Sequence, residues 1–204
     1  MRAGLAWWAA VALMLDWHLG MVETEDGRPR PLGPADALTL ARVWLAPAML
    51  DEPRPVLVSL AGASDVLDGV VARAGESTRI GRDLEGLADA CFVGAALRGA
   101  RRRELVGSTV TAAELTRLGA GLGYALAVWF GTAAAPDPAV LRAARLTTPV
   151  RIGGLVAAGL GRRRLAETLM LGGCLASVAA VLRAHVRVLA CAPPAQSHAE
   201  ERLR

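Results

Sequence analysis

Four acidic residues in the middle of the chain recur at helical spacing. Asp65 and Asp68 are three positions apart, and Glu85 and Asp89 are four positions apart. Either spacing places two side chains on one face of a helix. The segment between the two pairs is short, so we expect two antiparallel neighbouring helices with all four carboxylates at the same depth.

Four clustered carboxylates repel one another, and each is costly to bury in a membrane unless it is paired. The nearby bases Arg73, Arg79 and Arg82 cannot all reach them. A divalent cation can, and ligands that are all oxygen atoms suit Mg²⁺ or Mn²⁺. The pattern therefore predicts a site for two such ions and a diphosphate substrate. The plainer alternative is a solvated acidic turn between two helices.

The elements that must position these residues are apolar. Of 204 residues, 53% are hydrophobic, and the mean hydropathy is +0.37. A soluble domain of this size is seldom so apolar. The apolar stretches are rich in Ala and Gly, which suits close packing of membrane helices, and they lack the alternation of β-strands. We predict an all-α integral membrane bundle of six core transmembrane helices plus an N-terminal apolar helix.

Breaks in the apolar pattern predict where the spans lie. The first stretch, 5–22, is either a signal peptide or a retained membrane or interfacial helix, which we favour because no small-residue cleavage site follows. A loop over 23–34 precedes a helix that Asp36 would cap and that runs to residue 50. Further spans are expected at 56–74, 82–98, 105–135, 148–160 and 165–189. We expect three divisions: an N-terminal helix and loop (1–32), a membrane domain (33–190) and a polar, disordered tail (191–204).

The remaining composition excludes two classes of site. All 23 Lys and Arg positions are arginine, and the formal net charge is +4. These arginines are scattered with few aromatic residues between them, so we expect no nucleic-acid partner. Cys91, Cys174 and Cys191 have neither metal-ligand nor redox spacing and are expected to pack as small apolar side chains.

The acidic pattern resembles the signature of the CDP-alcohol phosphatidyltransferase family, D-x2-D-G-x2-A-R, then seven or eight residues, then G-x3-D-x3-D. The chain carries it as Asp65, Asp68, Gly69, Ala72, Arg73, Gly81, Glu85 and Asp89. Its one departure is Glu85 in place of the third aspartate. Upstream, the family's N-x-L-T-x2-R-x4-P appears with Asp in place of Asn, as Asp36, Leu38, Thr39, Arg42 and Pro47. The resemblance spans roughly residues 33–190.

This resemblance implies a six-helix membrane enzyme of phospholipid biosynthesis. Such an enzyme moves a phosphatidyl or similar phosphoryl group from a CDP-linked donor, such as CDP-diacylglycerol, to an alcohol and releases CMP. The metal ligands would be Asp65, Asp68, Glu85 and Asp89, and Asp89 would also be the general base. Donor contacts are implied for Asp36, Thr39, Gly69, Ala72, Arg73, Thr78 and Gly81. Members are commonly homodimers, so a homodimer embedded in membrane lipid is implied as well.

The acceptor alcohol is less well specified by the sequence. Glycerol 3-phosphate or phosphatidylglycerol is the first expectation, and an inositol phosphate is the second. Arg145 and Arg151 are candidates for binding an acceptor phosphate. The alternative is that both arginines extend to lipid headgroups at the membrane surface.

Orientation and activity each leave a rival interpretation. A CDP-linked donor implies a plasma-membrane protein with its active site facing the cytoplasm. The arginines at 101–103 and 162–164 fall on the opposite face and favour the reverse orientation by the positive-inside rule. The rival to an enzyme is a non-catalytic membrane protein of the same fold, in which Glu85 marks a degenerate metal site.

Overall fold

The computed structural model describes residues 2–18, 28–29, 31–74, 79–128 and 136–191. Within these ranges the chain forms seven α-helices and no strand, which confirms the all-α prediction. The helices are α1 (Arg2–His18), α2 (Pro34–Met49), α3 (Pro55–Ala74), α4 (Arg79–Arg102), α5 (Ser108–Leu126), α6 (Pro138–Gly159) and α7 (Arg163–Cys191). Of the helices in the described ranges, α7 alone has the length and apolar composition of a membrane span, over Arg163–Arg187. The prediction of six spans is therefore not confirmed.

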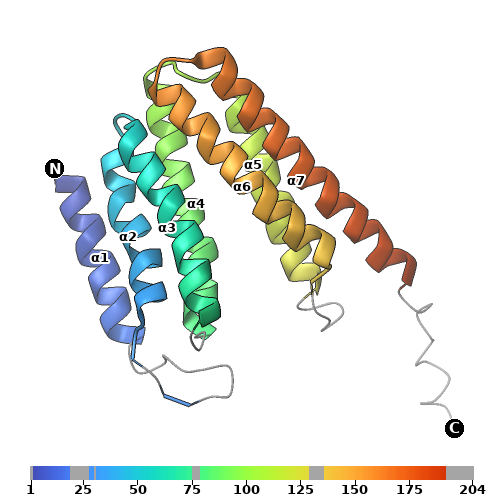
Figure 1. Cartoon of the computed structure of the whole chain (residues 1–204), viewed down its shortest axis with the longest axis horizontal. Coiled ribbons are helices and arrows are strands. Elements are labelled where there is room, and N and C mark those ends of the chain that lie inside the picture. Colours follow the sequence, from blue (N-terminus) through green and yellow to red (C-terminus); the bar gives the residue numbers. More distant parts are fainter. Residues whose placement is uncertain (1, 19–27, 30, 75–78, 129–135, 192–204) are drawn as a thin grey trace, which may run out of the picture.

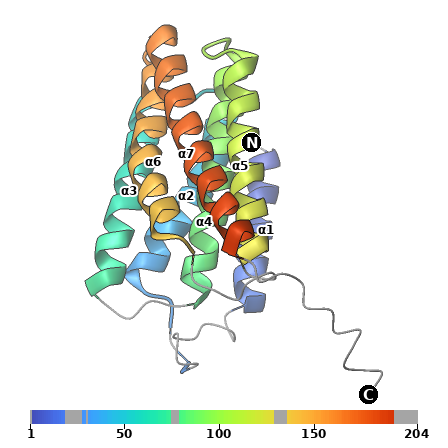
Figure 2. The same cartoon turned by 90° about the vertical axis from the view of Figure 1, so that its right-hand side faces the viewer.

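The six helices after α1 pack as two groups of three. In one group α2 contacts both α3 and α4, and in the other α7 contacts both α5 and α6. Contacts between α3 and α6 join the groups, and α1 lies outside α2 (Figures 1 and 2). The two groups approach each other at the end where α6 meets α7 and diverge toward the end where α3 meets α4 (Figure 1).

Small residues allow this close packing. A Cβ added at Gly62 of α3 would lie 2.8 Å from Ile152 Cγ2 of α6, and one added at Gly154 of α6 would lie 2.5 Å from Met170 Cγ of α7. Large apolar side chains instead cover outward-facing surfaces, among them Leu60, Leu67, Leu122, Leu146, Leu175 and Leu182. Small residues between helices and large apolar residues outside are typical of helices packed in lipid.

The start of α2 differs from the prediction. Gly33 is the N-cap and Pro34 is the first helical residue, so the prediction that Asp36 caps the helix is wrong. Asp36 lies within the first turn, where its Oδ2 accepts a hydrogen bond of 2.7 Å from the Gly33 N–H. The fixed φ angle of proline favours the first helical position, which moves the start upstream of Asp36.

The start of α6 also differs, and this change bears on the site. The helix begins at Pro138 rather than at residue 148, because Asp137 caps it and accepts a 2.7 Å hydrogen bond from the Ala139 N–H. Arg145 and Arg151 therefore lie on one continuous helix that packs against α3 and α7.

Candidate active site

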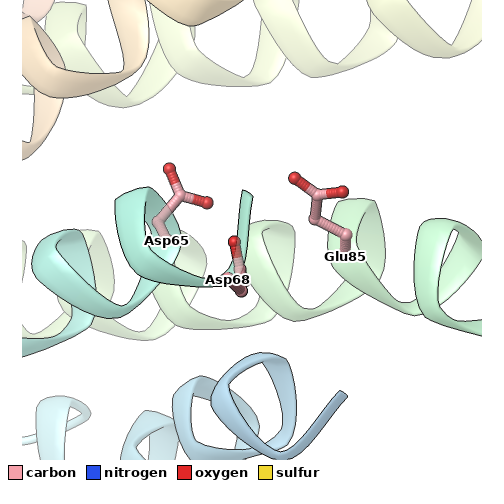
Figure 3. Close-up of side chains that lie close together, drawn as sticks. All are labelled: Asp65, Asp68 and Glu85. Atoms are coloured by element: carbon pink, nitrogen blue, oxygen red, sulfur yellow. The ribbon is translucent and has the colours of Figure 1, made fainter. Parts of the chain in front are cut away.

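Three predicted metal ligands come together from two helices. Asp65 and Asp68 lie on α3 and Glu85 lies near the start of α4, and one oxygen of each is within 4.8 Å of the other two. The carboxylates of Asp65 and Glu85 extend to the same side of α3 and α4, with Asp68 between them (Figure 3). Opposite oxygen ligands of Mg²⁺ lie about 4.1 Å apart. The three carboxylate oxygens are therefore nearly close enough together to bind one cation.

Asp68 is the most deeply buried of these acids, with 3% of its surface exposed. Its Oδ2 accepts hydrogen bonds from Arg42 Nη1 at 2.6 Å and from Thr39 Oγ1 at 3.1 Å. Its Oδ1 is buried and has no hydrogen-bond partner among the residues that the structure describes. Burying a carboxylate oxygen without a partner is costly. A divalent cation bound between Asp65, Asp68 and Glu85 would remove that cost, so these residues fit the predicted metal.

Arg42 of α2 lies among the acids and is 2% exposed. Besides Asp68, its Nη1 lies 3.5 Å from Asp65 Oδ1, and its Nε lies 2.9 Å from Asp89 Oδ1. The contact with Asp89 is an ion pair that lacks the geometry of a hydrogen bond. We call Arg42, Asp65, Asp68, Glu85 and Asp89 the acidic cluster. Its four carboxylates and one guanidinium carry a formal excess of three negative charges, which favours binding of cations.

Asp89 does not belong to the group of three oxygens within 4.8 Å of one another. It faces Arg42 instead, and its side chain is 35% exposed. Its predicted roles as a metal ligand and general base therefore stay predictions. Asp89 and Asp65 nevertheless line one cavity, so the second acidic pair opens to the same space as the first.

The far wall of that cavity comes from α6. Thr148 and Arg151 line it opposite Asp65 and Asp89. Arg151 is 5% exposed, so its side chain does not extend to lipid headgroups as the alternative interpretation required. Arg145 is exposed. Of the two arginines predicted to bind the acceptor, the structure thus brings Arg151 into the cavity that Asp65 and Asp89 line.

The predicted donor contacts are placed unevenly. Thr39 is buried and directs its hydroxyl to Asp68, Asp36 is buried in the first turn of α2, and Gly69 follows Asp68 on α3. Three others lie on helices, but their side chains fall outside the description: Ala72 and Arg73 on α3, and Gly81 on α4. Thr78 lies outside the described residues altogether. The roles of all these residues in binding the donor stay predictions.

Two charged residues of this region had no predicted role. Arg42 was matched to the upstream family motif but was given no function. Glu114 of α5 was overlooked because it lies within an apolar stretch. Glu114 is 1% exposed, and its Oε1 accepts a 2.6 Å hydrogen bond from Arg151 Nη1. The one signal for Glu114 was its charge, because an acidic residue inside an apolar span needs a buried partner.

Carboxylates that converge from two helices, inside a bundle with apolar outer faces, define a helical protein with an acidic group that could hold a divalent cation. Residues 34–181 match the CDP-alcohol phosphatidyltransferase family, and the chain belongs to that family, as its signature predicted. No curated protein and no solved structure matches the chain. The family is membrane-associated and normally uses a divalent metal. Its members are transferases of phospholipid biosynthesis that use a CDP-alcohol donor and an alcohol acceptor.

Proposed function

We propose that this protein transfers a phosphatidyl group from CDP-diacylglycerol to a phosphorylated alcohol and releases CMP. The observation that carries the proposal is the buried, unpartnered Asp68 Oδ1 between Asp65 and Glu85, because it indicates a cation site where the family signature predicts one. Glycerol 3-phosphate or phosphatidylglycerol is the first candidate acceptor, and an inositol phosphate is the second. All three carry a phosphate, which suits the arginine on the far wall of the cavity.

Each group around the diphosphate has a distinct task. Two Mg²⁺ or Mn²⁺ ions held by Asp65, Asp68 and Glu85, with Asp89 as the fourth predicted ligand, would stabilise the charge that develops on the departing CMP. Arg42 keeps two of these carboxylates paired inside the bundle, at 2.6 Å from Asp68 and 2.9 Å from Asp89. On the predicted donor side, Gly69 lets the nucleotide approach α3 closely, and Arg73 binds a phosphate.

The transfer itself exchanges one bond to phosphorus for another. The acceptor hydroxyl oxygen forms a bond to the phosphorus of the phosphatidyl group, and the bond from that phosphorus to the CMP oxygen breaks. CMP leaves with the bonding electrons. The hydroxyl proton passes to Asp89, whose carboxylate lines the cavity and is oriented by Arg42.

The setting of the bundle is part of the proposal. Large exposed apolar side chains on α3, α5, α6 and α7 support an integral membrane position. We place the protein in the plasma membrane. We place the end that carries the acidic cluster in the cytoplasm, because the CDP-linked donor is made available there. Arg102 and Arg163 lie at the opposite end of the helices and act as anchors at the other surface (Figure 1). The homodimer implied by the family resemblance belongs to the same proposal.

The direct test is release of CMP by the purified protein in lipid nanodiscs containing CDP-diacylglycerol. Each of the three acceptors is supplied in turn, with Mg²⁺, Mn²⁺ or a chelator. We expect release that depends on the metal and on one acceptor, and that Asp68→Ala reduces to background. Asp51→Ala is the matched control, since the Asp51 side chain is 81% exposed and pairs with Arg102 at the other end. Normal release by Asp68→Ala would overturn the proposed role of Asp68.

The rival function is distinguished in the same experiment. A non-catalytic protein of this fold predicts that the parent chain, Asp68→Ala and Asp51→Ala all release CMP at the same background rate with every acceptor. If Mn²⁺ still binds to the parent chain under those conditions, the cation site exists without the transferase activity.

A further inference from the structure

A second buried group of charges lies between α5, α6 and α7. Glu114 Oε1 accepts from Arg151 Nη1 at 2.6 Å and from Arg117 Nε at 2.7 Å, while Glu114 Oε2 lies 3.0 Å from the Cys174 thiol, which donates to it. We call Glu114, Arg117, Arg151 and Cys174 the Glu114 cluster. Both carboxylate oxygens have partners, and the two arginines exceed the one carboxylate by one positive charge. Burying Glu114 and Arg151 as ionised side chains is expensive, so this arrangement requires more than packing to explain it.

The cluster holds Arg151 in a single position. Besides the bond to Glu114, Arg151 Nη2 donates to Thr148 Oγ1 at 3.3 Å. Its aliphatic part lies against Gly173 of α7, where an added Cβ would be only 2.6 Å from Arg151 Cγ. Any larger residue at position 173 would displace the arginine. Three separate contacts, from three helices, therefore fix this side chain.

One donor of the fixed side chain remains unused. Arg151 Nε is buried and has no hydrogen-bond partner within the described part of the chain, although the residue is 5% exposed. Arg151 also lines the cavity that Asp65 and Asp89 line. A buried guanidinium with an unsatisfied N–H, at the edge of a cavity, is suited to bind an anionic oxygen of a ligand.

We propose that Glu114 is a positioning residue that orients Arg151 toward the phosphate of the acceptor, so that the protein selects phosphorylated over unphosphorylated alcohols. This inference rests on the proposed transferase function. Glu114 does not contact the substrate in this account. It neutralises part of the buried positive charge and fixes the Nη1 edge, so that the rest of the guanidinium keeps one orientation toward the cavity.

The test is the kinetics of Glu114→Gln, which keeps the shape of the side chain and removes its charge. We expect the KM for glycerol 3-phosphate to rise roughly tenfold, the value of one lost charge-assisted hydrogen bond. The kcat should change by less than about threefold, since the reacting groups are untouched. The preference for glycerol 3-phosphate over glycerol should fall by the same factor as KM rises. Glu114→Asp keeps the charge and should recover part of the affinity.

Two further variants decide between positioning and a merely structural role. Glu167→Gln is the matched control, since Glu167 pairs with the exposed Arg163 at the start of α7, outside the Glu114 cluster, and should leave KM unchanged. Gly173→Ala displaces Arg151 from a different helix and should raise the same KM if Glu114→Gln does not fold. An unchanged acceptor KM in Glu114→Gln, or in Gly173→Ala where Glu114→Gln does not fold, overturns the inference, as does a loss confined to kcat.

Binding separates the failure of this inference from the failure of the proposed function. Glycerol 3-phosphate should raise the unfolding temperature of the parent chain but not that of Glu114→Gln, and glycerol should raise neither. A parent chain that shows this shift but releases no CMP contradicts the transferase function and supports the anion site. A parent chain that releases CMP and shows equal shifts with Glu114→Gln contradicts the inference alone.

Discussion

The two buried charge clusters differ in sign and in how completely they are paired. The acidic cluster of α2, α3 and α4 has an excess of negative charge and an unpartnered oxygen, Asp68 Oδ1. The Glu114 cluster of α5, α6 and α7 has an excess of positive charge, and both oxygens of its carboxylate are paired. The first is therefore suited to receive cations, and the second is suited to hold an arginine still. A donor diphosphate with its ions and an acceptor phosphate require this pair of environments side by side.

The largest effect is expected from removing the single base of the acidic cluster. Arg42→Ala leaves the buried Asp68 and the partly exposed Asp89 without their counter-charge, which should lower the free energy of unfolding by about 3–5 kcal/mol. Saturating Mn²⁺ should recover a large part of this loss, because the ions replace the missing positive charge. The measurement is unfolding by SDS titration with and without Mn²⁺. Arg102→Ala, which breaks an exposed pair, should cost less than about 1 kcal/mol. An Arg42→Ala protein that Mn²⁺ does not stabilise would contradict this view of the cluster.

Removing the acid of the other cluster gives the contrasting case. Glu114→Ala leaves Arg151 unpaired and should lower the free energy of unfolding by about 2–4 kcal/mol. The loss should be smaller than for Arg42→Ala, because the Arg117 side chain is 19% exposed and can reach polar surroundings. Mn²⁺ should not recover the loss in the same SDS titration. Recovery by Mn²⁺ would show that the two clusters form one metal site.

Glu85 tests how strictly the acidic cluster depends on charge. Glu85→Gln should weaken Mn²⁺ binding by about tenfold, the value of one charged contact. Glu85→Asp restores the residue of the family signature and should bind Mn²⁺ at least as tightly as the parent chain, with equal or higher activity. The check is Mn²⁺ titration followed by electron paramagnetic resonance, together with CMP release. Equal binding by Glu85→Gln and the parent chain would remove Glu85 from the ligand set.

The smallest effect is expected at Cys174, the weakest partner of Glu114. Cys174→Ala removes a thiol donor and should raise the KM for glycerol 3-phosphate by about twofold. Cys174→Ser keeps a donor at this position and should leave KM unchanged. Steady-state kinetics of both variants decide the matter, and a larger loss in the serine variant than in the alanine variant would contradict the role of this hydrogen bond.

The sequence predicted well what depends on local spacing. The pairs Asp65–Asp68 and Glu85–Asp89 lie within one turn of a helix, so their shared faces follow from helical periodicity alone. The short connection predicted that the two helices are neighbours, but each of them packs mainly on α2; the structure still brings Asp65, Asp68 and Glu85 together. The helix count followed in the same way from breaks in the apolar pattern.

Pairing between distant residues could not be predicted in this way. Arg42 and Asp68 are 26 positions apart, and Arg151 and Glu114 are 37 positions apart. Only the packing of α2 on α3, and of α5 and α6 on α7, brings these charges together. The start predicted for α6 at residue 148 was wrong because Asp137 caps a helix that already begins at Pro138.

In the proposed function, the acidic cluster binds the cations on which transfer depends. The most direct measurement is a parallel titration with Mn²⁺, in which bound ion and the rate of CMP release are recorded on the same sample of the purified protein. If the acidic cluster binds these ions, both curves should rise together in the parent chain and Asp68→Ala should show neither. Release of CMP by the parent chain at full rate in the presence of a chelator, or strong Mn²⁺ binding by Asp68→Ala, would contradict this role.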